Sequence, residues 1–199
     1  MSIQERRQRD RDERGRLIVR TARELAEAEG WDAVTVRRLA DRIEYSQPVL
    51  YSHFAGREAI VSAVALEGFA ELAETMRQAR QSGAAGPAPA WAAVARAYAG
   101  FAAANPALYE AMFTLATDLP FARPEAPAPL KAGFAEIRDA LAPVAGERNP
   151  AMLAEVAWSA LHGLVTLNQA GRLSAGQQDA RLALLVGLVT TAAPALPGT

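Results

Sequence analysis

Apolar residues recur along most of this chain at the spacing of an α-helix, not in the alternation of a β-strand. Between residues 12 and 29, Ile18, Ala22 and Leu25 fall on one side, and the pattern stops at Gly30. Apolar residues three and four positions apart share a helical face, so this segment predicts an amphipathic helix. The pattern returns between clusters of Gly and Pro, which predicts further helices near 35–42, 47–53, 57–80, 90–104, 106–117, 128–142, 151–171 and 177–192.

These segments predict an all-α fold of about nine helices. No segment has the pattern of a convincing strand, and 51% of the residues are hydrophobic. We expect a three-helix head over residues 1–62, in which residues 1–15 form a flexible arm, and a helical body over residues 63–199. The Gly- and Pro-rich segment at 82–89 interrupts the helical pattern and lies near the expected joint.

Residues 35–54 predict two short helices separated by a tight turn. Thr35 and Ser46 occupy N-cap positions, and Pro48 falls in the first turn of the second helix, where proline is tolerated. The second helix should bury Leu50 and leave an outer surface formed by Gln47, Val49, Tyr51, Ser52 and His53. A short helix that presents small, polar and aromatic groups fits the floor of a DNA major groove. The pattern therefore predicts a helix-turn-helix that reads DNA.

The segment from 16 to 62 resembles the DNA-binding domain of the tetracycline repressor (TetR) family of bacterial transcription regulators. Residue types and spacings agree at Ala22, Leu25, Gly30-Trp31, Val34-Thr35-Val36, Leu39-Ala40, Leu50-Tyr51-Ser52-His53-Phe54 and Arg57-Glu58. The resemblance implies a homodimeric regulator, most simply a repressor of a palindromic operator. Its head would bind DNA, and its body would bind a small-molecule effector and dimerise through helices eight and nine. Trp158, His162 and Gly163 also resemble a tryptophan–histidine–glycine signature from one branch of the family.

Two residues in the turn depart from the family pattern. Family members usually carry glycine at the position of Glu44 and a small aliphatic residue at the position of Tyr45. Glycine adopts the left-handed conformation freely, whereas glutamate there costs on the order of 1 kcal/mol. We therefore expect these two residues to affect the geometry of the turn but not the fold.

The candidate DNA-contacting residues lie on the helix pair and at the start of the next helix: Thr35, Arg37, Ser46, Gln47, Pro48, Val49, Tyr51, His53 and Arg57. The amide of Gln47 can form two hydrogen bonds with adenine, and Pro48 can touch a thymine methyl group. Arg37 can contact either a guanine or a phosphate. The family resemblance assigns Tyr51 and His53 to backbone phosphates.

Further phosphate contacts are possible at the ends of this region. Thr35 and the free amides behind it can hold a phosphate at a helix N-terminus, and Arg57 can do so with its charge. The arginine-rich segment 6–16 can enter the minor groove or follow the phosphates. Because acidic residues interleave with these arginines, a solvated and frayed terminus is the open alternative.

Six residues of the body are candidates for a ligand pocket: Phe101, Tyr109, Met112, Phe113, Trp158 and His162. Mostly apolar walls with a few polar groups describe a small-molecule site, which predicts an apolar or aromatic effector that hydrogen-bonds near His162 or Tyr109. We expect Met112 to border the cavity. Each of the six also fits an ordinary core position, and His162 fits a satisfied interior histidine.

The C-terminal helices carry the features of a subunit interface. The run Leu182–Leu188 is uncharged, and small residues on the helix near 151–171 would let a partner helix approach closely. An apolar area of this size is rarely left in contact with water. We therefore expect a homodimer that pairs through helices eight and nine, with Leu185 inside the interface.

The remaining chemistry of the chain is sparse. There is no cysteine, which excludes disulfides, thiolate catalysis and cysteine-ligated metals. His162 is the one histidine outside the helix pair. We therefore predict no catalytic residues, no metal site, no cofactor and no enzymatic activity. Two alternatives stay open: a small-molecule carrier and a small all-α enzyme, each with a vestigial helix-turn-helix.

Charge and hydropathy bear on location and partners. The chain has a net charge of −1, but residues 1–57 contain twelve arginines against ten acidic residues, which weakly favours DNA binding by the N-terminus. The N-terminus lacks the apolar core of a signal peptide. The uncharged stretch from Leu182 contains Pro194 and Pro197 and is too interrupted to span a bilayer. We expect a soluble, cytoplasmic protein that binds double-stranded DNA and no membrane.

Overall fold

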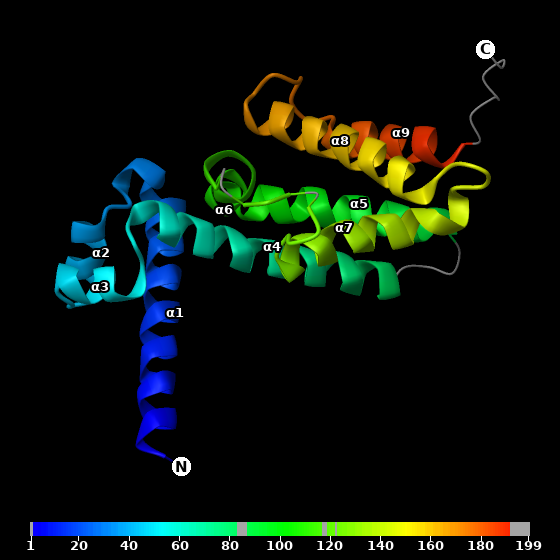
Figure 1. Ribbon diagram of the computed structural model, residues 1–199. Helices are drawn as coiled ribbons and strands as arrows, with labels where there is room; N and C mark the ends of the chain where they lie inside the picture. The colour runs from blue at the N-terminus through cyan, green and yellow to red at the C-terminus, as the bar shows by residue number, and fades with distance from the viewer. Residues whose placement is uncertain (1, 83–86, 117–118, 122, 192–199) are drawn as a thin grey trace. The chain divides into compact units, whose positions relative to one another are not determined.

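The computed structural model describes residues 2–82, 87–116, 119–121 and 123–191, and these contain nine α-helices and no strand (Figure 1). The predicted all-α fold is confirmed. The helices are α1 Ile3–Glu29, α2 Val36–Arg42, α3 Gln47–His53, α4 Arg57–Ser82, α5 Pro87–Ala104, α6 Pro106–Glu110, α7 Ala128–Leu141, α8 Pro150–Gln169 and α9 Gln178–Thr190. The sixth predicted helix is divided, because a π-helical turn over Ala111–Leu115 follows α6.

The chain divides into two compact units. The first, called the head unit here, comprises Met1–Phe69 and Asn105–Pro127, and the second, the body unit, comprises Ala70–Ala104 and Ala128–Thr199. The sequence pattern did not predict that the segment after residue 104 packs with the N-terminal helices. Residues 83–86 of the expected joint lie outside the described residues, and the functional boundary at residue 62 stays a prediction.

Within the head unit, α2 and α3 pack against the C-terminal half of α1 (Figure 1). Ile18 and Leu25 of α1 are buried together with Leu39 of α2 and Leu50 of α3. These are the positions that the helical periodicity placed on the inner faces. Burying side chains of this size contributes roughly 1.5–3 kcal/mol each, so the packing fixes α3 firmly on α1.

The first helix begins nearer the N-terminus than the sequence pattern predicted. Ser2 Oγ accepts a hydrogen bond from the Glu5 backbone N–H at 3.1 Å, and a Glu5 carboxylate oxygen accepts one from the Ser2 N–H at 2.7 Å. This capping box starts the helix at Ile3, not near residue 12. The predicted flexible arm is therefore wrong for residues 3–15, which are helical, because capping and charge pairing extend the helix beyond its apolar stripe.

The turn between α2 and α3 has the strained geometry that the departure from the family pattern predicted. Glu44 has φ 58°, and it is the one non-glycine residue with positive φ in the part of the chain that the structure describes. The Tyr45 N–H donates to the Ala40 carbonyl at 2.9 Å, which closes the turn as in a Schellman motif. Thr35 caps α2 by accepting from the Arg38 N–H, whereas the Ser46 hydroxyl makes no capping bond to α3.

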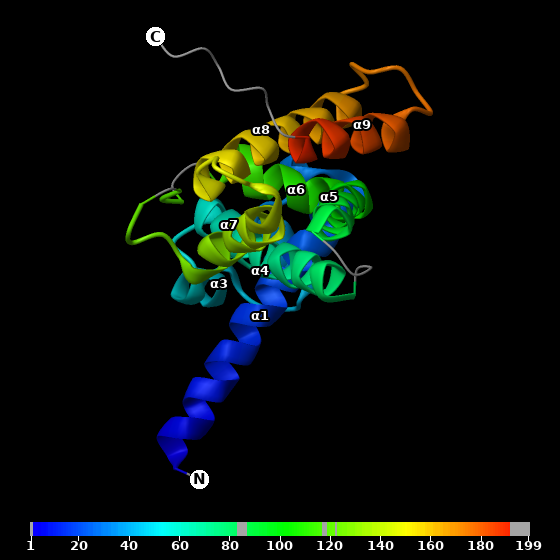
Figure 2. The same cartoon turned by 90° about the vertical axis from the view of Figure 1, so that its right-hand side faces the viewer.

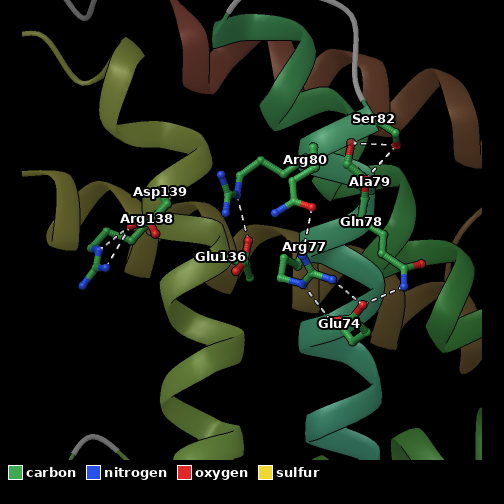
Figure 3. A network of polar contacts seen from close by, with 10 residues as sticks. Glu74, Arg77, Gln78, Ala79, Arg80, Ser82, Glu136, Arg138 and Asp139 are labelled. Carbon is green, nitrogen blue, oxygen red and sulfur yellow. Dashed lines mark hydrogen bonds and ion pairs between the residues drawn. The ribbon is translucent and has the colours of Figure 1, made fainter.

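In the body unit, α5 packs against α7, α8 and α9 (Figure 2). The helix α5 contributes Trp91 and Tyr98 to the core. An ion pair also joins α7 to the C-terminal part of α4. In this pair, Arg80 Nε donates to a Glu136 carboxylate oxygen at 2.7 Å (Figure 3). These contacts hold the helices of the body unit around one apolar core.

The helix α9 turns a different face inward from the one expected. Leu185 is buried within its own subunit, as are Leu182 and Val189, so the prediction that Leu185 lies in the dimer interface is wrong. The exposed apolar side chains of α9 are instead Leu184 and Leu188. Periodicity marks apolar residues on α9 but does not distinguish its two apolar faces.

Among the described residues, α8 alone is long and apolar enough to cross a bilayer, a weak criterion that the core helix of a soluble protein also meets.

The strained turn generates the first testable prediction. Replacing Glu44 with glycine should raise the free energy of unfolding by about 0.5–1 kcal/mol, because glycine relieves the left-handed strain but adds entropy to the unfolded chain. Urea unfolding measures the change. Glu44→Ala is the matched control and should bring no gain, because alanine keeps the Cβ that causes the strain. If the Glu44→Gly variant has no higher free energy of unfolding than the parent protein, the backbone at Glu44 is not strained.

Candidate nucleic-acid interface and ligand-binding residues

The outer face of α3 has the exposure expected of a surface that reads DNA. Leu50 is buried and anchors the helix, while Gln47 and Pro48 are exposed and Tyr51 keeps 56% of its surface accessible. Val49 is half-buried. The helix thus presents amide, apolar and phenolic groups on a firmly held backbone, and their contacts with bases and phosphates stay predictions.

Two neighbouring arginines on α2 differ in their availability. The side chain of Arg37 is 82% exposed and lies 4.0 Å from the Asp41 carboxylate, a surface pair that costs little to break. Arg38 instead forms two hydrogen bonds with the Glu29 carboxylate, at 2.9 and 3.0 Å. Arg38 is therefore held against Glu29, and Arg37 is the more available of the two to turn toward a ligand.

Arg57 is engaged inside the head unit. Its Nε donates to the Val34 carbonyl at 3.0 Å, and its Nη2 donates to the Trp31 carbonyl at 2.9 Å. These bonds tie the first turn of α4 to the segment that leads into α2. The predicted phosphate contact would have to use the donors that remain, and the structure makes Arg57 a positioning residue for the helix pair.

The C-terminal end of α3 lies against α1. Arg11 Nη2 donates to the Ser52 carbonyl at 2.8 Å. Partial burial, followed by the charges of Arg11 and Arg14, lowers the pKa of His53 below its usual value. The imidazole is therefore neutral at neutral pH, and its predicted contact with a phosphate would be an N–H hydrogen bond without a charge.

Three of the predicted ligand residues belong to the head unit. The rings of Tyr109 and Phe113 lie 4.6 Å apart, and Phe113 meets Phe69 edge to face at 5.2 Å. Met112 is fully buried, and a Cβ at Gly68 would lie only 2.7 Å from its sulfur. Met112 therefore packs closely against α4 at Gly68, and its place at the border of a ligand cavity stays a prediction.

The N-terminus of α6 is bound to α1 by interactions that the sequence analysis missed. The Glu27 carboxylate accepts hydrogen bonds from the backbone N–H groups of Ala107, at 3.1 Å, and Leu108, at 2.9 Å. The Trp31 indole N–H donates to the Ala107 carbonyl at 2.7 Å. We call these contacts of Glu27 and Trp31 with Ala107 and Leu108 the α1–α6 clamp. A tryptophan N–H needs a partner when buried, but the sequence does not show a partner 76 residues away.

The other three predicted ligand residues belong to the body unit. Trp158 Nε1 donates to the Tyr98 hydroxyl at 3.2 Å, and this hydroxyl lies 3.4 Å from His162 Nδ1. On the far side of the ring, His162 Nε2 lies 3.4 Å from the Thr166 hydroxyl. Phe101 is buried on α5, the helix that also carries Tyr98.

This polar chain has a neutral imidazole at its centre, because burial lowers the pKa of His162. Tyr98 was missed by the sequence analysis, although it lies three residues before Phe101 on the same helix. Its hydroxyl joins Trp158 to His162, which explains how two half-buried polar groups are satisfied. No group of three or more His, Asp or Glu residues that could hold a metal occurs among the described residues.

Comparison with family models gives two matches that together cover most of the chain. Residues 18–64 match the model described as bacterial regulatory proteins, tetR family. Residues 91–190 match the model described as tetracyclin repressor-like, C-terminal domain. The second match alone spans half of the chain. The tryptophan–histidine–glycine branch stays a prediction.

Two curated relatives match over shorter stretches. The HTH-type transcriptional regulator YobS of Bacillus subtilis (strain 168) is 33% identical over 98 residues, which are 48% of this chain and 49% of YobS. The class C tetracycline repressor protein of Escherichia coli is 44% identical over 48 residues, which are 24% of this chain and 22% of the repressor. The alignments thus span about half or less of the length of these relatives.

A solved structure extends the likeness over nearly the whole fold. A protein of unknown function from Rhodococcus sp. RHA1 superposes with a TM-score of 0.71 at 25% sequence identity. The superposition covers 88% of this chain and 93% of the other. The arrangement of helices is therefore shared beyond the helix-turn-helix.

Proposed function

This chain belongs to the tetracycline repressor (TetR) family of bacterial regulatory proteins, and we propose that it is a cytoplasmic, homodimeric repressor released from a palindromic operator by a small effector. The observation that carries the proposal is the outer face of α3. There, exposed Gln47, Pro48 and Tyr51 stand on a helix anchored by buried Leu50. A small-molecule carrier or a small enzyme would have no use for this face, and DNA binding that weakens steeply with salt separates the proposal from both.

In the proposed complex, α3 lies in the major groove. Gln47 reads adenine, Pro48 and Val49 touch thymine methyl groups, and Arg37 contacts guanine from the exposed side of α2. Tyr51 donates to a phosphate, and His53 and Thr35 add neutral contacts to the backbone. Ser46, at the first turn of α3, completes the set. Base contacts supply the sequence preference, and phosphate contacts fix the register.

The proposed dimer pairs α8 and α9 with their counterparts in a four-helix bundle. Five large apolar side chains on these helices are exposed: Met152 at 64%, Val156 at 61%, Leu167 at 46%, Leu184 at 65% and Leu188 at 66%. Apolar area of this extent on one helix pair is typical of a subunit interface. Two copies of α3 held roughly 34–36 Å apart would then meet successive major grooves of a palindromic site.

The proposed effector is an apolar or aromatic molecule with at least one hydrogen-bonding group. Two groups of residues support this chemistry: the chain Trp158–Tyr98–His162 in the body unit, and the rings of Tyr109 and Phe113 in the head unit. The helices α6 and α8 contain no Lys or Arg, which disfavours a strongly anionic ligand. An effector that binds more tightly to the conformation that cannot hold DNA lowers the affinity for DNA. By linkage, DNA lowers the affinity for the effector by the same factor.

Variants of the reading face test DNA recognition. Arg37→Ala and Gln47→Ala should each reduce the preference for the operator over a scrambled duplex by about 1–3 kcal/mol, because each loses a base contact. Tyr51→Phe is the control and should weaken both duplexes equally, since phosphates carry no sequence. Fluorescence anisotropy on duplexes selected by the parent protein measures the affinities. Variants that bind and discriminate like the parent would show that α3 is not the reader.

A charge in the exposed apolar face of α9 tests the dimer. Leu184→Arg should produce monomers that bind the operator poorly, because the guanidinium would be desolvated against an apolar partner. Ala103→Arg adds the same charge at an exposed position of α5 and should leave the dimer intact. Light scattering at micromolar concentration gives the mass. A parent protein that is itself monomeric there would overturn the proposed interface.

Removal of single hydroxyl groups tests the effector site. The effector is first identified in a screen, as a compound that raises the melting temperature of the parent protein and releases this protein from its operator. Tyr98→Phe should weaken its binding about tenfold, because one hydrogen bond within a buried polar chain is worth roughly 1–1.5 kcal/mol. Tyr109→Phe is the matched variant for the head unit, and the more affected of the two identifies the polar anchor. If the effector releases both variants and the parent protein from the operator equally well, the effector binds elsewhere.

A further inference from the structure

The N-terminal part of α1 extends beyond the helix pair that it supports. Figures 1 and 2 show this part of the helix continuing past α3 into solvent. Every residue from 2 to 14 is exposed, so no apolar burial holds this segment, and the capping box at Ser2 maintains the helix to its first turn. A helix that is ordered without a core to cover is available to contact another molecule.

The helical conformation separates charges that the sequence interleaves. At about 100° per residue, Arg7, Arg11 and Arg14 fall on one face, in line with buried Ile18 and Leu25 further along α1. The acidic residues of the segment fall about 100° or more away from Arg11 around the axis: Glu5, Asp10, Asp12 and Glu13. We call the first face the Arg7–Arg11–Arg14 stripe.

The stripe adjoins the C-terminal end of α3. Arg11 donates to the Ser52 carbonyl at 2.8 Å, and the charges of Arg11 and Arg14 both reach His53, where they help to lower the pKa of its ring. Arg14 itself donates through Nε to the Asp10 backbone carbonyl, not to a carboxylate, so its charge is not neutralised by this bond. The stripe therefore begins where the exposed face of α3 ends.

We infer that the Arg7–Arg11–Arg14 stripe binds the phosphate backbone of the DNA that flanks the segment read by α3. This inference rests on the proposed function, because α3 must first be placed in the groove. From Arg7 to Arg14 the helix rises roughly 10 Å, about the rise of three phosphates of one strand along the DNA axis. The stripe lengthens the footprint of each head along the backbone and adds affinity without sequence preference.

The experiment compares two double variants of the full-length protein that lose the same charge from opposite sides of α1. Arg7→Gln with Arg14→Gln removes two members of the stripe. Arg9→Gln with Arg16→Gln is the matched control on the far face. Glutamine is shorter than arginine but removes the charge while keeping a polar, unbranched side chain of similar helix propensity, and circular dichroism checks that the helix persists. Affinity is measured against salt concentration, on a duplex selected by the parent protein and on a mixed-sequence duplex of equal length.

Loss of two phosphate contacts should reduce the slope of log K against log salt by about 1.8 in the stripe variant, on both duplexes. The control should change the slope by less than half of this, and neither variant should change the ratio between the two duplexes. If the two double variants show equal slopes of log K against log salt while the parent protein binds DNA normally, the stripe does not bind phosphates, but the proposed function stands. A parent that shows no salt-dependent DNA binding would overturn the stripe together with the proposed function.

Discussion

The carboxylate of Glu27 joins α1 to the N-terminus of α6. It accepts hydrogen bonds from the N–H groups of Ala107 and Leu108, two donors that have no partner within α6 itself. A negative charge at a helix N-terminus is also favoured by the helix dipole. The indole of Trp31 fixes the same turn through the Ala107 carbonyl, and both residues follow the stretch of α1 that supports α2 and α3. As a result, the segment after residue 104 belongs to the head unit.

This constraint gives the proposed regulation a physical basis. Gly68 lets α4 approach the buried side chains of Leu108 and Met112 so closely that a Cβ at this position would clash with both. A segment held by α1 on one side and packed on α4 on the other has little freedom to move alone. An effector that shifts α6 or its π-helical turn would therefore have to strain the α1–α6 clamp and, through it, the helix that carries α3. Close-packed interfaces favour discrete arrangements over gradual deformation.

The sequence predicted those features that depend on neighbours along the chain. Helical periodicity located all nine helices of the described residues, the cap at Thr35 needed only local signals, and the left-handed Glu44 followed from a departure at a glycine position. The capping signal of Ser2 and Glu5 was also local, but it lay outside the apolar pattern that was used to begin the first helix. Features that need distant partners were not predictable in this way. The α1–α6 clamp and the link from Tyr98 to His162 join residues far apart in sequence, and the inward face of Leu185 depends on which helices pack against α9.

The contacts of Glu27 and Trp31 imply that α6 and the DNA-reading helices form one cooperative unit through the α1–α6 clamp, and amide hydrogen exchange can test this coupling. We expect operator DNA to slow exchange at the Ala107 and Leu108 amides, although neither residue lies on the reading face, because DNA stabilises the state in which Glu27 holds them. In the Glu27→Gln variant, operator DNA should still slow amide exchange in α1, α2 and α3, but it should have little effect on the Ala107 and Leu108 amides. Protection by DNA that is confined to α1, α2 and α3 in the parent protein, with unchanged exchange at residues 105–115, would contradict the claim.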